Sequence, residues 1–177
     1  MIKFVARLPV IDFFRGIIDA MAVSYSTASS NATLPVTLRC ARRNLGVSNS
    51  VASFVIRLGA TINMNGTAMY LGLATLFGAQ VFGVPLSWGE YVTISILGTL
   101  GAIGAAGIPG SGLIMMVLVF SAVKVPLDTI ALVAGIDRIM DMMRTTTNVS
   151  GDAAVATTVA SLTGEIDQAE MVSADDV

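Results

Sequence analysis

Apolar and polar positions divide the chain into four long apolar blocks separated by short polar stretches. A helix needs about 20 predominantly apolar residues to cross a bilayer, and each block is longer than that, although the first is the most polar and the fourth carries several charges. We therefore predict an all-α integral membrane protein with a core over residues 1–163 and an acidic, disordered, cytoplasmic tail over residues 164–177. The four blocks run over residues 13–40, 51–84, 91–123 and 127–163.

The third block predicts a re-entrant helical hairpin. It carries no charge over residues 91–123, but its middle, residues 101–112, contains five glycines and a proline, which form a poor helix interior. The helical arms on either side reach only about 15 Å each, and neither crosses a core of ~30 Å. A non-helical tip at membrane depth is tolerated where protein or water covers it. The alternative is a single kinked helix.

The first block predicts a second hairpin, with the serine-rich residues 24–35 at its tip. Each hairpin is followed by a helix that we expect to be interrupted midway, at residues 63–67 and 148–152. Both segments have the pattern Asn-x-polar-Gly-polar. Inverted repeats with broken helices that meet at the midplane are typical of secondary transporters. Positive charges flank the first hairpin, so we place that side in the cytoplasm.

Composition narrows the function classes. The chain is 54% hydrophobic and only 12% charged, whereas soluble domains carry about 25% charged residues. Its net charge of -2 argues against a nucleic-acid partner. The chain has no histidine and a single cysteine, Cys40, which exclude a metal site of the Cys/His type and an internal disulfide. No nucleophile–base pair or cofactor loop is present, so we do not expect an enzyme.

Five polar residues in the fourth block fall on one helical stripe, within an arc of roughly 80°. A charge at the bilayer centre costs at least ~2.5 kcal/mol, so such groups face a protein interior or a ligand. Arg144 can grip a carboxylate with two parallel hydrogen bonds, and Asp141 can hold an ammonium group. Together they suit aspartate or glutamate. The alternative is an Asp141–Arg144 ion pair that only holds the helices together. The stripe consists of Asp137, Asp141, Arg144, Asn148 and Asp152.

Hard oxygen donors gather at the two expected helix breaks. Asn63, Asn65, Asn148 and Asp152 supply amide and carboxylate oxygens of the kind that small hard cations prefer. Transporters also use unwound backbone carbonyls to coordinate Na⁺ or H⁺. Each asparagine could instead make an ordinary interhelical hydrogen bond.

Four motifs, in order and with fitting spacing, resemble the dicarboxylate/amino acid:cation symporters, the glutamate-transporter family. The likeness covers about residues 13–163 and rests on residues 29–35, 59–67, 104–112 and 137–152. It implies the transport domain of an elevator-type transporter, with two re-entrant hairpins and two interrupted transmembrane helices in inverted repeat. It also implies a multi-pass protein of the cytoplasmic (inner) membrane. Full-length members are trimers with an N-terminal scaffold half, so we expect this chain to be a C-terminal fragment that contacts membrane lipid.

The resemblance also implies site residues. The substrate-binding residues would be Ser29, Ser30, Thr67, Ile108, Pro109, Gly110, Ser111, Gly112, Asp141, Arg144, Thr145 and Asn148. The sodium-binding residues would be Gly59, Thr61, Asn63, Met64, Asn65, Ala102, Ile103, Ala105, Asn148 and Asp152. Asn65 stands where the family typically has aspartate, so the coupling ion, Na⁺ or H⁺, and its stoichiometry stay open. No other cofactor is expected.

We therefore expect cation-coupled symport of acidic amino acids across the cytoplasmic membrane. One alternative is a C4-dicarboxylate such as succinate, which would leave Asp141 without a partner. Another is a membrane fragment that does not transport by itself and needs a partner half.

Overall fold

The computed structural model describes residues 1–105 and 107–167. Over these residues the regular structure is helical, apart from one isolated antiparallel bridge between Val47 and Ile166. The all-α prediction is confirmed. The elements are the short π-helix η1 (Ile2–Ala6), α1 (Val10–Gly16), α2 (Ile18–Thr27), α3 (Ser30–Arg43), α4 (Asn49–Ile62), α5 (Asn65–Val81), α6 (Trp88–Gly104), α7 (Ser111–Ala122) and α8 (Asp128–Thr163).

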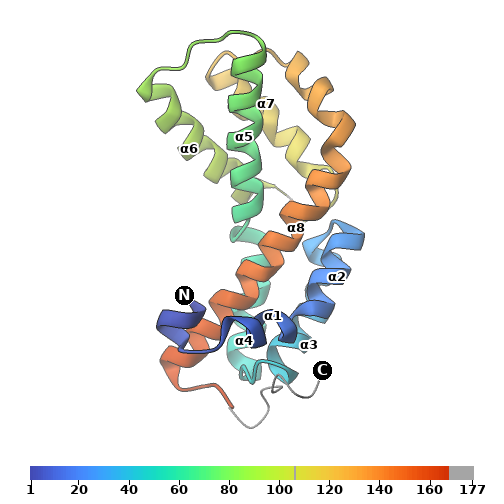
Figure 1. The fold of residues 1–177 in the computed structure, drawn as a ribbon, viewed down its shortest axis with the longest axis vertical. Coiled ribbons are helices and arrows are strands. Elements are labelled where there is room, and N and C mark those ends of the chain that lie inside the picture. Colours follow the sequence, from blue (N-terminus) through green and yellow to red (C-terminus); the bar gives the residue numbers. More distant parts are fainter. Residues whose placement is uncertain (106, 168–177) are drawn as a thin grey trace.

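Helix α8 runs the length of the molecule and joins two lobes (Figure 1). The lower lobe consists of η1, α1–α4 and the C-terminal part of α8, and its apolar core includes Phe13, Ile56 and Ala156. The upper lobe consists of α5–α7 and the N-terminal part of α8, with Phe120 and Val133 in its core. The predicted polar stripe of α8 lies between these two apolar cores.

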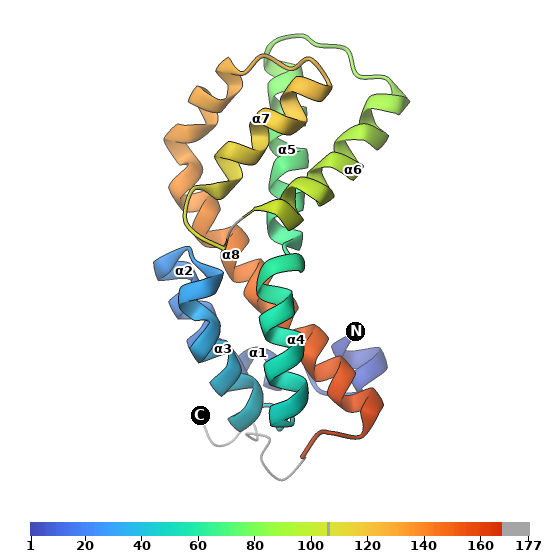
Figure 2. The same ribbon diagram turned by 180° about the vertical axis from the view of Figure 1, so that it is seen from behind.

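Two helix pairs point their tips at each other from opposite lobes (Figure 2). The first tip, residues 28–30, joins α2 to α3, and the Ser29 hydroxyl accepts a hydrogen bond from the Ala32 N–H at 3.2 Å, capping α3. The second tip, residues 107–111, precedes α7. The Ser29 hydroxyl donates to the Gly107 carbonyl at 2.8 Å, so the tips touch. The helix pairs occupy the two predicted hairpin segments, and their re-entry into a membrane stays a prediction.

The two expected helix breaks have different outcomes. The chain leaves the helical conformation at Asn63 (ψ 58°) and Met64 (ψ 50°), between α4 and α5. The predicted interruption at residues 148–152 is wrong, because α8 is one helix from Asp128 to Thr163. Among the helices that the structure describes, none is both long and apolar enough to cross a membrane, in contrast to the two transmembrane helices expected from the sequence.

The lower end of the molecule is closed by a clamp between residues 46–50 and 164–167. The Asp167 N–H donates to the Gly46 carbonyl at 2.8 Å, and the Ser48 N–H to the Glu165 carbonyl at 3.1 Å. The hydroxyls of Ser48 and Ser50 donate to the Glu165 carboxylate at 2.6 and 2.8 Å, and these bonds lower the pKa of Glu165. The prediction of a disordered tail is therefore wrong for residues 164–167, and the rest of that predicted tail, residues 168–177, lies outside the described residues.

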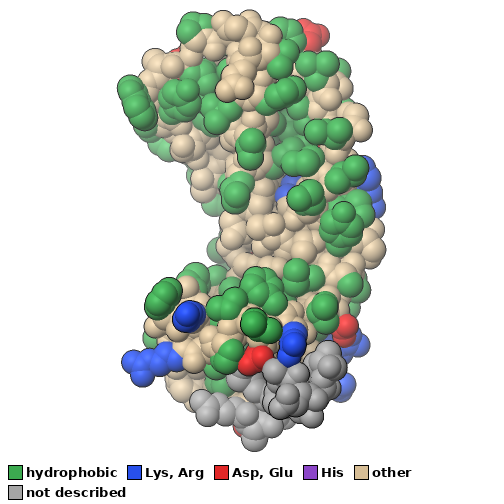
Figure 3. Space-filling model, viewed as in Figure 1, with side chains coloured by type: hydrophobic (Ala, Val, Ile, Leu, Met, Phe, Trp, Pro, Cys, Tyr) green, Lys and Arg blue, Asp and Glu red, His purple; other side chains and the backbone are tan. Residues whose placement is uncertain are grey.

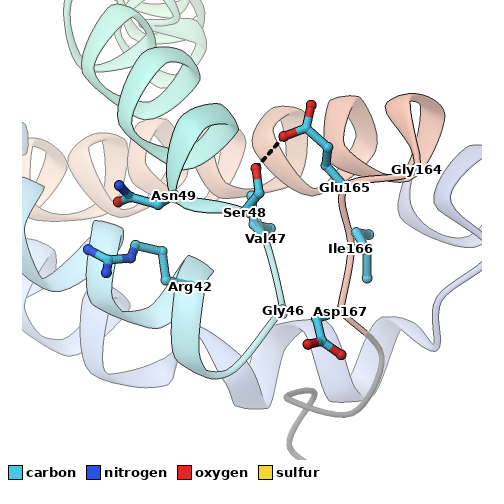
Figure 4. A pocket seen from close by; sticks show the side chains of 9 residues that line it. All are labelled: Arg42, Gly46, Val47, Ser48, Asn49, Gly164, Glu165, Ile166 and Asp167. Atoms are coloured by element: carbon cyan, nitrogen blue, oxygen red, sulfur yellow. Dashed lines mark hydrogen bonds between the residues drawn. The ribbon is translucent and has the colours of Figure 1, made fainter.

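The clamp borders a polar cavity of about 570 Å³ at the lower end of the molecule (Figure 4). Arg42 also lines it, from the end of α3. Elsewhere on the surface, large apolar side chains are exposed over both lobes (Figure 3). They include Leu73, Ile96, Ile114 and Leu132.

Candidate functional site

A small cavity lies where the two tips meet the middle of α8. Its volume is about 10 Å³, close to the space that one water molecule needs. Four segments distant in sequence therefore converge on one point: the first tip, the start of α5, the second tip and α8. The lining residues are Ala28, Ser30, Met64, Thr67, Gly107, Ile108, Ser111, Asp141, Arg144, Thr145 and Asn148.

Asp141 and Arg144 form a buried ion pair one helical turn apart on α8. Arg144 Nε donates to Asp141 Oδ1 at 2.9 Å, and both side chains are only 4% exposed. The Thr145 hydroxyl lies 3.5 Å from the same oxygen. The ion pair considered as an alternative from the sequence is therefore present. It uses one edge of the guanidinium only.

The two terminal nitrogens of the Arg144 guanidinium, Nη1 and Nη2, are held in place without hydrogen bonds. Its carbon lies 4.8 Å from the centre of the Tyr70 ring, a cation–π distance. Nη1 is 3.8 Å from Asp137 Oδ1, which itself accepts the Tyr70 hydroxyl at 2.7 Å. Nη2 is 2.9 Å from Asp141 Oδ1 without the alignment of a hydrogen bond. Among the described residues, both Nη atoms are thus buried donors with no acceptor.

The second tip packs directly on this pair. The Gly110 N–H donates to Asp141 Oδ2 at 2.7 Å. A Cβ atom at Gly112 would collide with Nη1 of Arg144, so only glycine allows this close approach. The two glycines bring the second tip against both charges of α8.

Asn148 joins α8 to the start of α5. Its Oδ1 accepts the Gly66 N–H at 2.7 Å, and its Nδ2 donates to the Thr67 hydroxyl at 3.2 Å. The sulfur of Met64 lies 3.5 Å from the same nitrogen. Because the first N–H groups of a helix lack intrahelical acceptors, Asn148 caps α5 from another helix.

The predicted sodium residues fall into two groups. Asn63 Nδ2 donates to Asp152 Oδ1 at 2.9 Å, and Gly59 packs against the same carboxylate. A second cavity, of about 330 Å³, is lined by Met64, Asn65, Ala102 and Ile103 among others. Over the described residues no cluster of three acidic, histidine or cysteine side chains is present, and Asp152 is the carboxylate of the first group.

Most predicted site residues lie together, and a few do not. Eight of the substrate residues line the small cavity: Ser30, Thr67, Ile108, Ser111, Asp141, Arg144, Thr145 and Asn148. Ser29, Gly110 and Gly112 contact its walls through the bonds and packing described above. Pro109 belongs to the second tip without lining the cavity, and the Thr61 hydroxyl is exposed and bonds the Leu58 carbonyl of its own helix. Ala105 is buried, and its N–H donates to the Ala102 carbonyl at 3.1 Å.

Sequence reasoning missed Tyr70 and Asn31. Tyr70 follows Thr67 by one helical turn and therefore faces α8 as Thr67 does, a periodicity that could have indicated its role. The Asn31 N–H donates to the Gly107 carbonyl at 3.3 Å. That contact joins the two tips, and no local pattern in the sequence signals it.

Comparison with known proteins identifies the family. The model of the sodium:dicarboxylate symporter family matches residues 1–162, and the chain belongs to this family. It is 48% identical over 141 residues to an excitatory amino acid transporter of Caenorhabditis elegans. The aligned region covers 80% of this chain and 28% of the relative. It is 47% identical over 148 residues to human excitatory amino acid transporter 2, covering 84% of this chain and 26% of the relative.

Human excitatory amino acid transporter 1 is 49% identical over 140 residues, covering 79% of this chain and 26% of the relative. The chain therefore spans about a quarter of the length of the curated relatives that it matches. The family and these relatives are transporters and not enzymes, in agreement with the prediction from sequence. The resemblance inferred from the four motifs is confirmed.

Proposed function

We propose that this chain forms the substrate-carrying part of a membrane symporter for acidic amino acids, aspartate or glutamate. The observation that carries the proposal is Arg144, whose buried Nη1 and Nη2 make no hydrogen bond and have only ionic contacts, with Asp137 and Asp141. Leaving a buried donor unsatisfied costs about 1–3 kcal/mol, and more for a charged group. A ligand carboxylate would remove this penalty with two parallel hydrogen bonds.

Asp141 supports the amino acid over a simple dicarboxylate. Its carboxylate is buried beside Arg144 and accepts an N–H from the second tip. An ammonium group could take the place of that N–H. Succinate offers no such donor and is the second candidate, favoured only because the family is that of sodium:dicarboxylate symporters.

A cation is the proposed driving ion. Asp152, Asn63 and Gly59 come together beside the break between α4 and α5, where oxygen donors would suit Na⁺. Asn65 supplies an amide in place of a carboxylate, so we propose Na⁺ or H⁺ without a fixed number of ions. The exposed apolar side chains of the upper lobe support contact with lipid or with a scaffold half. We also propose that the protein crosses the inner membrane several times and assembles as a trimer.

Binding and uptake of radiolabelled L-aspartate test the proposal. The full chain would be purified in detergent and reconstituted in liposomes, with and without a Na⁺ gradient. Saturable binding that Arg144→Ala abolishes and Arg138→Ala retains would support the site, since Arg138 is exposed and bonds the Ser26 carbonyl. Uptake by the chain alone would support a complete carrier, and binding without uptake a part that needs a partner half. Absence of saturable binding would contradict the proposal.

A further inference from the structure

Both oxygens of the Asp141 carboxylate are already engaged without a ligand. Oδ1 accepts Arg144 Nε at 2.9 Å, and Oδ2 accepts the Gly110 N–H at 2.7 Å. The adjoining cavity of about 10 Å³ is far too small for an amino acid. Each carboxylate oxygen can accept a second hydrogen bond, but this cavity leaves no room for an ammonium group. A ligand that binds Asp141 therefore has to move the second tip, and with it the Gly110 N–H, away from Oδ2.

The backbone conformation of Gly110 aims its N–H at Asp141. Its φ is +80° and its ψ is -4°, in the left-handed region. No atom lies within 4 Å of the place where a Cβ would stand, so crowding does not require glycine there. The requirement is conformational, because a residue with a Cβ disfavours this region by roughly tenfold or more.

Other contacts keep the second tip in this position. The Gly107 carbonyl accepts both the Ser29 hydroxyl, at 2.8 Å, and the Asn31 N–H, at 3.3 Å. Gly112 lies against the guanidinium of Arg144. The second tip is thus attached to the first tip at one end and to the charged pair at the other.

We propose that the Gly110 N–H is an internal substitute for the ligand's ammonium group on Asp141. Resting on the function proposed above, this gives a physical reason for a requirement for an amine. An amino acid exchanges one donor on Asp141 for a stronger, charged one. A dicarboxylate displaces the N–H without supplying another hydrogen-bond donor, which leaves a buried oxygen of Asp141 unsatisfied. Sites built around such a hydrogen bond reject analogues that lack the group by large factors, so succinate should bind at least ~100-fold more weakly than L-aspartate.

Gly110→Ala tests the exchange. The added Cβ disfavours the conformation that presents the N–H, so Asp141 becomes easier to reach and L-aspartate should bind about tenfold more tightly. Gly83→Ala is the matched control, because Gly83 also has a positive φ, +63°, and open space around its Cβ position, but lies in the loop between α5 and α6. An unchanged or weaker affinity of the Gly110→Ala chain would overturn the proposal.

Hydrogen exchange of the Gly110 amide tests the contact without any ligand. The amide should be protected in the full chain and should exchange at least ~10-fold faster in Asp141→Ala. The exchange rate of the Met116 amide in α7 should be the same in both chains. Equal exchange rates at Gly110 in the two chains would overturn this inference. A protected Gly110 amide in a chain that binds no aspartate would instead contradict only the function proposed above.

Discussion

Residues 63–67 and 148–152 share the pattern Asn-x-polar-Gly-polar, yet only the first segment lies at a helix break. The backbone leaves the helix at Asn63 and Met64, whereas α8 continues through all of residues 148–152. The unbroken segment supplies a hydrogen-bond acceptor to the helix that starts after the break. Asn148 accepts the Gly66 N–H at 2.7 Å. The same local pattern therefore has two structural outcomes, and the contacts between the segments distinguish them.

The side chains of the two segments interlock. Asp152 accepts Asn63 Nδ2 at 2.9 Å. A Cβ at Gly151 would stand 3.0 Å from Asn65 Nδ2 and 3.1 Å from Asn63 Nδ2, so the glycine leaves room for both amides. In α8, then, this pattern provides a groove and acceptors on an intact helix. In the α4–α5 segment it provides the Gly66 N–H and the Asn63 side-chain amide, which donate to those acceptors.

Gly66→Ala should disturb the contact between α5 and α8 most. The new Cβ would stand 2.5 Å from the Arg144 carbonyl oxygen, part of the backbone of α8, so the two helices must separate. We expect a loss of about 3 kcal/mol in the free energy of unfolding, the upper range for overpacking. Gly72→Ala is the control in the same helix, with no atom within 4 Å of its Cβ position, and should be neutral or slightly stabilising. Denaturant titration in detergent measures both, and equal effects would contradict the account.

Asn148→Ala should have the next largest effect. It leaves the buried Gly66 N–H without an acceptor, which costs about 2 kcal/mol. The neighbouring Thr147→Ala removes an exposed hydroxyl that bonds the Met143 carbonyl of its own helix, and should change stability by less than about 0.5 kcal/mol. The two variants are compared in the same titration. A neutral Asn148→Ala would show that α5 needs no cap from α8.

Asn63→Ala should destabilise the chain by about 1 kcal/mol. It removes a hydrogen bond to Asp152, but Asn63 is only partly buried, so water can replace part of the interaction. Asn49→Ala, an exposed asparagine at the start of α4, is the control. Thermal unfolding of the two variants side by side measures the difference. Equal melting temperatures would mean that the Asn63–Asp152 contact adds nothing.

The smallest effect concerns the clamp at the far end of α8. The pKa of Glu165 is lowered in the folded chain. The carboxylate therefore stabilises the folded state at a pH above the unfolded pKa, about 4.3, and this stabilisation is lost as the pH falls through the lower folded pKa. Acid should therefore release the Asp167 N–H from Gly46, and Glu165→Gln should remove this pH dependence. Hydrogen exchange should show the amides of residues 148–152 still protected. Their opening with the clamp would mean that the clamp, and not α5, keeps α8 intact.

The sequence predicted the all-helical fold and the polar stripe of α8 well, because both depend on residue type and period. The stripe from Asp137 to Asp152 follows from helical periodicity alone, and the structure buries it between two apolar cores. Eight residues expected to bind substrate do line one cavity. Their role in binding stays a prediction.

The errors concern contacts between segments far apart in the sequence. Glycine and asparagine at residues 148–152 lower helix propensity by less than about 1 kcal/mol each, and the packing of α8 against α4 and α5 outweighs that preference. The Gly110–Asp141 and Ser29–Gly107 contacts involve backbone groups, which every residue has, so no residue type signals them. Residues 164–167 read as a polar tail, yet Ile166 pairs with Val47 and packs on the lower core.

The central claim, that intact α8 supports the broken helix, is tested most directly by hydrogen exchange in Asn148→Ala. The account predicts faster exchange at Gly66 and Thr67, at the start of α5, while residues 149–152 of α8 keep their protection. Loss of protection in both segments, or in neither, would contradict it.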